Sequence, residues 1–272
     1  ADDWTGSTFR YTRLIGEATW YTEALPGLVF GARIRGGWVN PGGFKGLGGG
    51  GASNQIVHPE KRLFAGGSNS VRGFGQNRLG PRVLYLRDVT ELVWGQEEDD
   101  PGLCNPDEIN TGDCDASGLA DARFLSQPKG GTGLLEGSLE ARFPLGGAIW
   151  EGATFLDFGQ VWDEDASLSF GDLEFTPGLG VRYLSPIGPI RVDLAYRFGA
   201  GEVLPVVTQA VVPFDPSIHT EKERLLTRAG ADTGFAVPGD LILLNNPIPF
   251  EDGLGNWSLR RFQLHFSIGQ AF

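Results

Sequence analysis

The residues best suited to chemistry are an arginine in a short polar segment and two distant carboxylates. The segment GGSNSVRGF covers residues 66–74 and sets Arg72 among glycines, serines and an asparagine. Glu140 and Asp157 are its candidate partners, each within a stretch whose side chains alternate between polar and apolar. A guanidinium between carboxylates makes charge-assisted hydrogen bonds and can bind one of them through two parallel bonds. This chemistry would fix chain segments in place rather than transform a substrate.

Other residues that often carry chemistry are too sparse to suggest a catalytic centre. No Ser/His/Asp grouping, phosphate-binding loop or cluster of metal ligands is apparent, so we expect no enzyme activity, no cofactor and no metal site. The cysteines, Cys104 and Cys114, lie in one acidic segment, far in sequence from His219 and His265. A disulfide that closes a loop in an oxidising compartment is therefore favoured over a metal site.

The acidic segment itself, from Glu97 to Asp121, allows two interpretations. Its carboxylates could bind calcium, but their spacing fits no EF-hand pattern. A solvated acidic loop is the favoured interpretation. The formal net charge of the chain is −12, which argues against nucleic acid as a partner.

Period-two alternation of apolar and polar residues dominates the chain and predicts β-strands with two different faces. In the stretch 135–143, for example, Leu139 and Phe143 alternate with Glu140. Asp157 likewise lies on the polar side of its stretch. Seven segments show the pattern: 9–21, 28–38, 135–143, 149–161, 174–184, 190–198 and 262–272.

These strands fit either a soluble sandwich or a transmembrane barrel, and the connections favour the barrel. Strands of about ten residues can cross a bilayer at a tilt. Aromatic side chains such as Trp20 and Trp150 lie near strand ends, as in interfacial girdles. Short and long connections also alternate, as they do in outer-membrane barrels. The short ones are 22–27, 144–148 and 185–189, and the long ones are 39–134, 162–174 and 199–258.

The polar segment 66–74 lies within the longest connection, 39–134. If this connection folds back into the barrel, Arg72 reaches the carboxylates of the polar face, and leaving either partner unpaired there would be costly. The alternative is a loosely ordered surface hairpin with Arg72 in solvent. The other long connection, 199–258, has apolar patches that predict some packed structure, with no role that the sequence assigns.

Several blocks of the sequence resemble, in order, the BamA superfamily of outer-membrane insertases and transporters. They are SVRGF (70–74) followed by GQNRLGPR, GSLEARFPL (137–145), ATFLDFGQVWD (153–163), GLGVRYLSPIGPIRVDLAY (178–196) and FQLHFSIGQAF (262–272). The resemblance implies an all-β fold, an antiparallel transmembrane β-barrel. About seven strands of this chain would be the C-terminal strands of a sixteen-stranded barrel. No POTRA domain is apparent within residues 1–272.

The resemblance also implies roles for individual residues. The motif Val71, Arg72, Gly73 and Phe74 would tuck into the lumen, where Arg72 would pair with Glu140 and Asp157. The cysteine pair Cys104 and Cys114 matches a disulfide-bearing stretch of the same loop. Gly269 would be a kink in the last strand, near the seam with the first strand. Phe272 would be the terminal aromatic residue of the C-terminal barrel signal.

The function that the resemblance implies is insertion of outer-membrane proteins, with client β-strands templated at a weak lateral seam. A two-partner-secretion translocation pore, or a structural barrel completed by another chain, are the alternatives. Expected partners are outer-membrane lipid and lipopolysaccharide, unfolded β-barrel clients, and accessory lipoproteins or further chains. We expect the chain in the bacterial outer membrane with its C-terminus on the periplasmic side.

Overall fold

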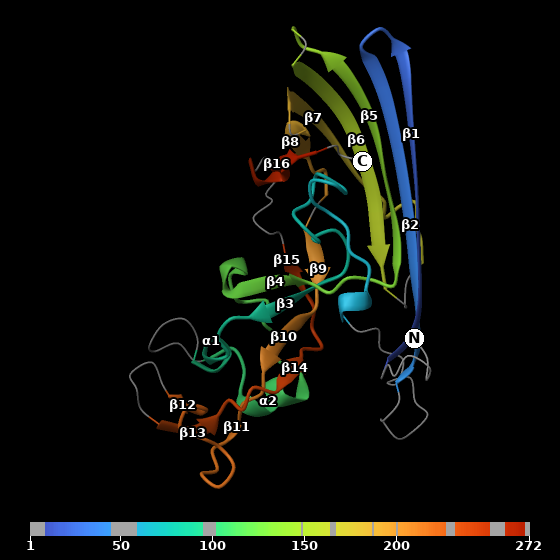
Figure 1. Cartoon of the computed structure of the whole chain (residues 1–272). Helices are drawn as coiled ribbons and strands as arrows, with labels where there is room; N and C mark the ends of the chain where they lie inside the picture. The colour runs from blue at the N-terminus through green and yellow to red at the C-terminus, as the bar shows by residue number, and fades with distance from the viewer. Residues whose placement is uncertain are drawn as a thin grey trace. The chain divides into compact units, whose positions relative to one another are not determined.

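The fold divides into two compact units in a computed structural model (Figure 1). The sheet unit comprises residues 1–81, 128–199 and 256–272, and the loop unit comprises residues 82–127 and 200–255. Among the residues that the structure describes, no helix is long and apolar enough to cross a lipid bilayer. The described residues are 9–44, 59–94, 102–147, 149–163, 167–186, 188–199, 201–226, 232–250 and 259–269.

The sheet unit contains one antiparallel sheet of seven strands in the order β1-β2-β5-β6-β7-β8-β16. Each predicted strand is present (Figure 1). Strands that are neighbours in the sheet are also consecutive in sequence, apart from the short strands that belong to the long connections. The all-β, antiparallel fold is therefore confirmed, as an open sheet in this chain. The strands are β1 (Phe9–Leu25), β2 (Leu28–Phe44), β5 (Gly133–Pro144), β6 (Trp150–Trp162), β7 (Glu174–Ser185), β8 (Gly188–Tyr196) and β16 (Phe262–Ile268). Short 3-10 helices cover Pro59–Lys61 and Leu259–Arg261.

The two faces of this sheet differ in the sense expected for a membrane barrel. One face exposes large apolar side chains, and the other buries charged ones. A soluble sandwich would bury its apolar face instead. The exposed set includes Leu14, Trp20, Ile34, Leu139, Leu156, Leu179, Leu194, Leu264 and Phe266. The buried charged set includes Glu136, Glu140, Asp157, Arg182, Arg191 and Asp193.

The loop unit is assembled from parts of both long connections, 39–134 and 199–258. One small sheet has the order β14-β10-β3-β4, in which β3 and β10 run parallel. Two further small sheets have the orders β11-β13-β12 and β15-β9. The elements are β3 (Arg82–Leu86), α1 (Thr90–Trp94), α2 (Pro106–Thr111), a 3-10 helix (Asp121–Arg123), β4 (Phe124–Pro128), β9 (Glu202–Leu204), β10 (Val206–Gln209), β11 (Val212–Pro213), β12 (Arg224–Leu226), β13 (Asp232–Ala236), β14 (Leu241–Leu243) and β15 (Ile248–Phe250).

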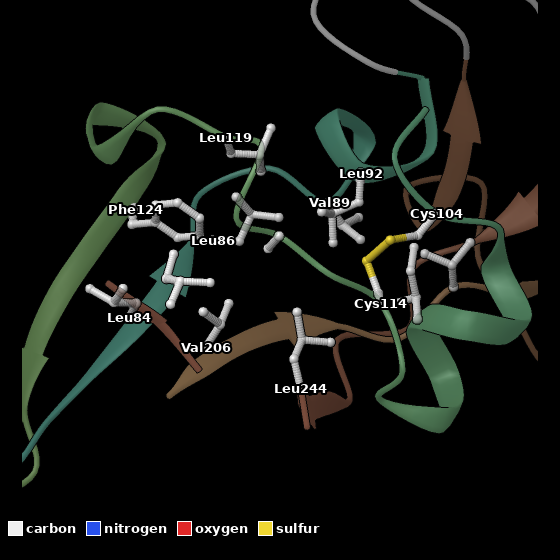
Figure 2. Close-up of a cluster of buried hydrophobic side chains, with 14 of the residues drawn as sticks. Leu84, Leu86, Val89, Leu92, Cys104, Cys114, Leu119, Phe124, Val206 and Leu244 are labelled. Carbon is white, nitrogen blue, oxygen red and sulfur yellow. A yellow bond between two sulfur atoms is a disulfide. The ribbon is translucent and has the colours of Figure 1, made fainter. Parts of the chain in front are cut away.

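This unit has a hydrophobic core of its own, to which both connections contribute (Figure 2). Leu84 and Leu86 of the first connection belong to one buried cluster with Val206 and Leu244 of the second. The predicted apolar patches of 199–258 therefore pack against 82–127. Burial of this cluster stabilises the unit by the hydrophobic effect.

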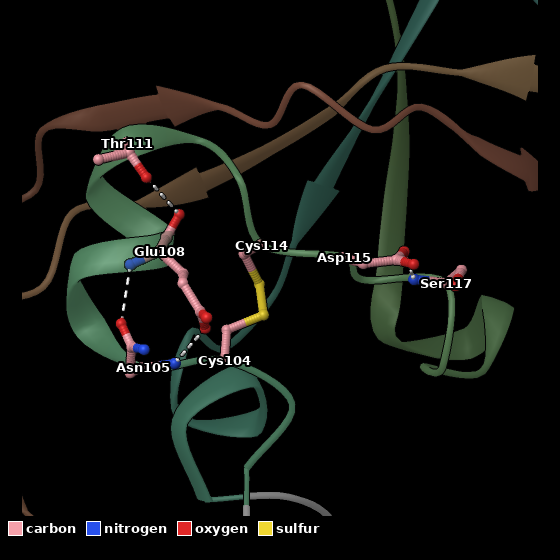
Figure 3. Close-up of a disulfide and its surroundings, with 7 residues drawn as sticks. All are labelled: Cys104, Asn105, Glu108, Thr111, Cys114, Asp115 and Ser117. Atoms are coloured by element: carbon pink, nitrogen blue, oxygen red, sulfur yellow. Dashed lines mark hydrogen bonds between the residues drawn. A yellow bond between two sulfur atoms is a disulfide. The ribbon is translucent and has the colours of Figure 1, made fainter.

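The predicted disulfide between Cys104 and Cys114 is present, with Cα atoms 5.5 Å apart (Figure 3). Both cysteines lie in the core cluster. Between them α2 begins with a capping box, in which the Asn105 side chain accepts from the Glu108 backbone and the Glu108 carboxylate accepts from the Asn105 backbone, each at 2.9 Å. The bridge thus closes a loop whose helix is already fixed at its N-terminus. Glu97–Asp100 of the acidic segment lie outside the described residues.

Candidate functional site

The segment 66–74 lies in a compact loop, residues 65–79, that is closed by backbone contacts and is called the motif loop below. Isolated bridges join Leu63 to Gly131 and Ala65 to Leu79. Within the loop, the Gly67 N–H donates to the Phe74 carbonyl at 3.0 Å. Gly67 has a φ of +112°, a conformation that side chains other than glycine rarely adopt.

Apolar side chains hold this loop against the sheet. Val71 and Phe74 belong to a buried cluster with Leu134 of β5 and Val161 of β6. Arg72 is 1% exposed, so the structure places it in the interior and not in solvent. The motif loop therefore lies on the polar face of the sheet.

Arg72 is bound mainly by Asp157 of β6. Its Nε donates to Oδ2 and its Nη2 donates to Oδ1, both at 2.8 Å, and the Arg72 backbone N–H donates to Oδ2 at 2.9 Å. Ser138 of β5 accepts from Arg72 at 3.1 Å and donates to Asp157 at 2.6 Å. The guanidinium also lies 3.3 Å from the centroid of the Phe155 ring, a cation–π contact. Two parallel bonds and a backbone bond fix both the side chain and the main chain of the motif.

Glu140 of β5 forms ion pairs with three arginines. Its Oε2 lies 2.8 Å from Arg72 Nη1, and its Oε1 lies 2.6 Å from Arg142 Nε and 2.8 Å from Arg182 Nη2. Asp193 of β8 adds a second carboxylate, 3.4 Å from Arg72 Nη1. Arg72, Arg182, Glu140 and Asp193 are all buried, so each charge depends on an opposite charge nearby.

Gly73 is required by close approach rather than by backbone conformation. Its N–H donates to the Thr176 hydroxyl of β7 at 3.3 Å. A Cβ built at Gly73 would clash with the Thr176 methyl and would lie 2.5 Å from the Thr176 Cβ. The next residue, Phe74, carries Arg197 above its ring at 4.4 Å. The motif thus touches strands β5 to β8 within four residues.

The residues just before the motif extend its contacts toward the other strands. Arg33 of β2 donates to the Asn69 carbonyl at 2.7 Å, and Arg191 of β8 donates to the Asn69 side chain at 2.6 Å. The Ser70 hydroxyl donates to Glu136, which also binds Arg33 at 2.9 Å. The same loop therefore contacts β2 and β8, the second strand from each edge of the sheet.

A second cluster of ion pairs lies near the start of the loop and involves Arg62, Lys129 and Asp163. Arg62 and Lys129 contact Asp163, just beyond β6, at 3.0 Å and 2.6 Å. Burial alone would raise the pKa of Asp163, but the hydrogen bonds from Lys129 and Arg62 lower it below its usual range. The carboxylate therefore stays charged at neutral pH and holds both cations.

The structure brings together Val71, Arg72, Gly73, Phe74, Glu140 and Asp157, the motif residues that the sequence singled out. Gly269 lies just past β16, with a φ of +105°, and Phe272 lies outside the described residues. Within the described ranges, no group of His, Cys, Asp and Glu is arranged to hold a metal ion. The sequence reasoning did not include Ser138, Thr176, Arg182, Arg191, Asp193 and His265 in the site, although the strand alternation carried a signal for several of them.

Comparisons with known proteins identify a matching family model and a similar solved structure. A family model described as the Omp85 superfamily domain matches residues 2–272. Among solved structures, the chain is similar to BamA from Haemophilus ducreyi lacking POTRA domains 1–3, with 19% identity and a TM-score of 0.45. That match covers 70% of this chain and 32% of the other, so this chain spans about a third of its length. Because the family model matches nearly the whole sequence, the chain belongs to the Omp85 superfamily.

Proposed function

We propose that this chain is the C-terminal part of an outer-membrane protein insertase, which templates client β-strands at a lateral seam. Membership in the Omp85 superfamily implies a location in the bacterial outer membrane. The observation that carries the proposal is the loop on the polar face, with Arg72 held by Asp157 and Glu140 while the opposite face is apolar. The activity is physical and involves no covalent step.

The seam is the edge of β16. In the described part of the chain, β16 pairs with β8 alone, over the register Phe262–Ile268 against Tyr196–Ile190. Unpaired backbone groups in lipid cost several kcal/mol each, so such an edge must find a partner strand. A client strand that pairs with this edge acquires the hydrogen bonds that it lacks in the membrane.

The motif loop would keep the wall ordered while the edge exchanges partners. Its contacts run from Arg33 on β2 to Arg191 on β8, so the loop links these strands across the polar face of the sheet. Unfolded β-barrel proteins are the proposed clients, and lipid, lipopolysaccharide and accessory lipoproteins are the proposed surroundings. The proposed orientation puts the C-terminus on the periplasmic side.

Reconstitution of the full-length protein in liposomes tests this proposal. We expect the parent protein to accelerate membrane insertion of an urea-denatured outer-membrane barrel, scored by protease protection and by heat-modifiable mobility. The Arg72→Ala variant should be slower than the parent, whereas Arg78→Ala, an exposed arginine of the same loop, should match it. A parent protein that conducts ions or exports a polypeptide without accelerating insertion would favour a translocation pore instead.

A further inference from the structure

His265 connects the terminal strand to the motif loop. Its Nε2 lies 2.8 Å from the backbone carbonyl oxygen of Arg72. The two residues are 193 positions apart in sequence. Of the described side chains of β16, His265 is the one with a hydrogen bond to the motif loop.

The neighbourhood of His265 places it at the edge of the ion cluster. In the strand register His265 faces Asp193 of β8, and Ser267 faces Arg191. Asp193 Oδ2 is 3.4 Å from both Arg72 and Arg191. Displacement of β16 away from β8 would therefore break the His265 bond while the bonds of Arg72 to β5 and β6 remain.

The chemistry of this bond is defined by its acceptor. A carbonyl oxygen only accepts, so the imidazole donates from Nε2–H, which both the cation and one neutral tautomer provide. An amide side chain at the same position can supply an equivalent N–H donor, whereas a phenyl ring cannot. Substitutions of His265 can thus distinguish the effect of the N–H donor from the effect of the aromatic ring.

We propose that His265 is a positioning residue that couples β16 to the motif loop, so that movement of the terminal strand is transmitted to Arg72. Its importance for insertion rests on the function proposed above, but the coupling itself is a property of the folded protein. A client strand that displaces β16 would release one end of the loop. The conformation of the motif would then depend on whether β16 is paired with β8.

Hydrogen–deuterium exchange of the purified full-length protein in nanodiscs tests the coupling without requiring any client. His265→Phe keeps a ring and removes the donor, and we expect exchange in peptides covering 66–74 and 262–268 to become about five-fold faster, as loss of one hydrogen bond predicts. His265→Gln restores a donor and should exchange nearly as slowly as the parent. Gln263→Ala, on the same face of β16, is the matched control and should leave the 66–74 peptides unchanged.

Each other result overturns the coupling. Unchanged exchange in His265→Phe would show that the bond does not hold the loop. Equal acceleration in His265→Gln would assign the effect to packing of the ring, and equal acceleration in Gln263→Ala would assign it to general loosening of β16. If the parent protein fails to insert clients, the proposed function fails while the exchange result still decides the coupling.

Discussion

Arg72 and Asp157 are joined by three hydrogen bonds, two from the guanidinium to the two carboxylate oxygens and one from the Arg72 backbone N–H. The side chain and the main chain of the motif are therefore held by a single residue of β6. Because both groups are buried, loss of Arg72 would leave Asp157 without its cation, whereas loss of Asp157 would leave Arg72 with Glu140 and Asp193.

Arg72→Ala is expected to lower the free energy of unfolding of the full-length barrel by roughly 3–5 kcal/mol, because Asp157 would remain buried without its cation. Urea titration of the protein in micelles, followed by heat-modifiable mobility, measures this loss. Arg78→Ala in the same loop removes an exposed arginine and should change stability by no more than about 0.5 kcal/mol. Equal losses in the two variants would contradict the role of Arg72 in anchoring the loop.

Arg82 shows why burial has to be known before a control is chosen. From the sequence it is a natural comparison for Arg72, since it follows the motif within the same connection. The structure shows that Arg82 is buried in the loop unit, with Glu202 at 3.1 Å. Its substitution would destabilise that unit for reasons unrelated to the motif.

Gly73→Ala is expected to destabilise the barrel by about 1–3 kcal/mol, because the added Cβ meets Thr176 and the loop must shift. Unfolding in urea again measures the effect. Gly75→Ala is a matched control, since its Cβ would lie 3.4 Å from Arg78 Cδ, an ordinary contact. The double variant Gly73→Ala with Thr176→Gly removes the opposing Cβ and should recover part of the loss. A double variant no better than Gly73→Ala would refute the steric explanation.

Removal of the disulfide should act on the loop unit alone. Replacement of Cys104 and Cys114 by serine is expected to lower the stability of that unit by about 2–3 kcal/mol, the chain-entropy value for a short loop. Proteolysis of the folded protein should then cut within 82–127 sooner, while the heat-modifiable mobility of the barrel is kept, because the loop unit has its own core. Non-reducing peptide mapping of the parent should recover the two cysteines in one linked peptide. Free thiols in purified parent protein would exclude the bridge.

The strands and the polar face could be predicted because alternation over about ten residues is a strong local signal. The same alternation places Arg191 and Asp193 on the polar face of β8, opposite in phase to Val192. The alternation does not predict which residues of different strands lie opposite one another, because that depends on the register of the strand pairs. The gathering of Arg182 and Asp193 around Glu140 and Arg72 therefore required the structure.

The loop unit could not be predicted for a different reason. Its strands are two to five residues long, too short for a period to be read. Its sheet joins segments more than a hundred residues apart, as in the parallel pair of Val206 with Leu84. Apolar patches in 199–258 predicted packed structure, but the structure was needed to show that they pack against residues of 82–127.

Gly269 offers a test in which backbone conformation is separated from packing. Its φ of +105° is unfavourable for residues with a Cβ, yet nothing lies within 4 Å of the position that a Cβ would take. Gly269→Ala should therefore cost roughly 1–2 kcal/mol from backbone strain alone. Gly16→Ala on β1 is the control, since it too has open space around its Cβ but no positive φ, and it should be neutral or slightly stabilising. If the two alanine variants unfold at the same urea concentration, the bend after β16 does not depend on glycine. A lower midpoint for Gly269→Ala alone would locate the strain at the end of the seam strand.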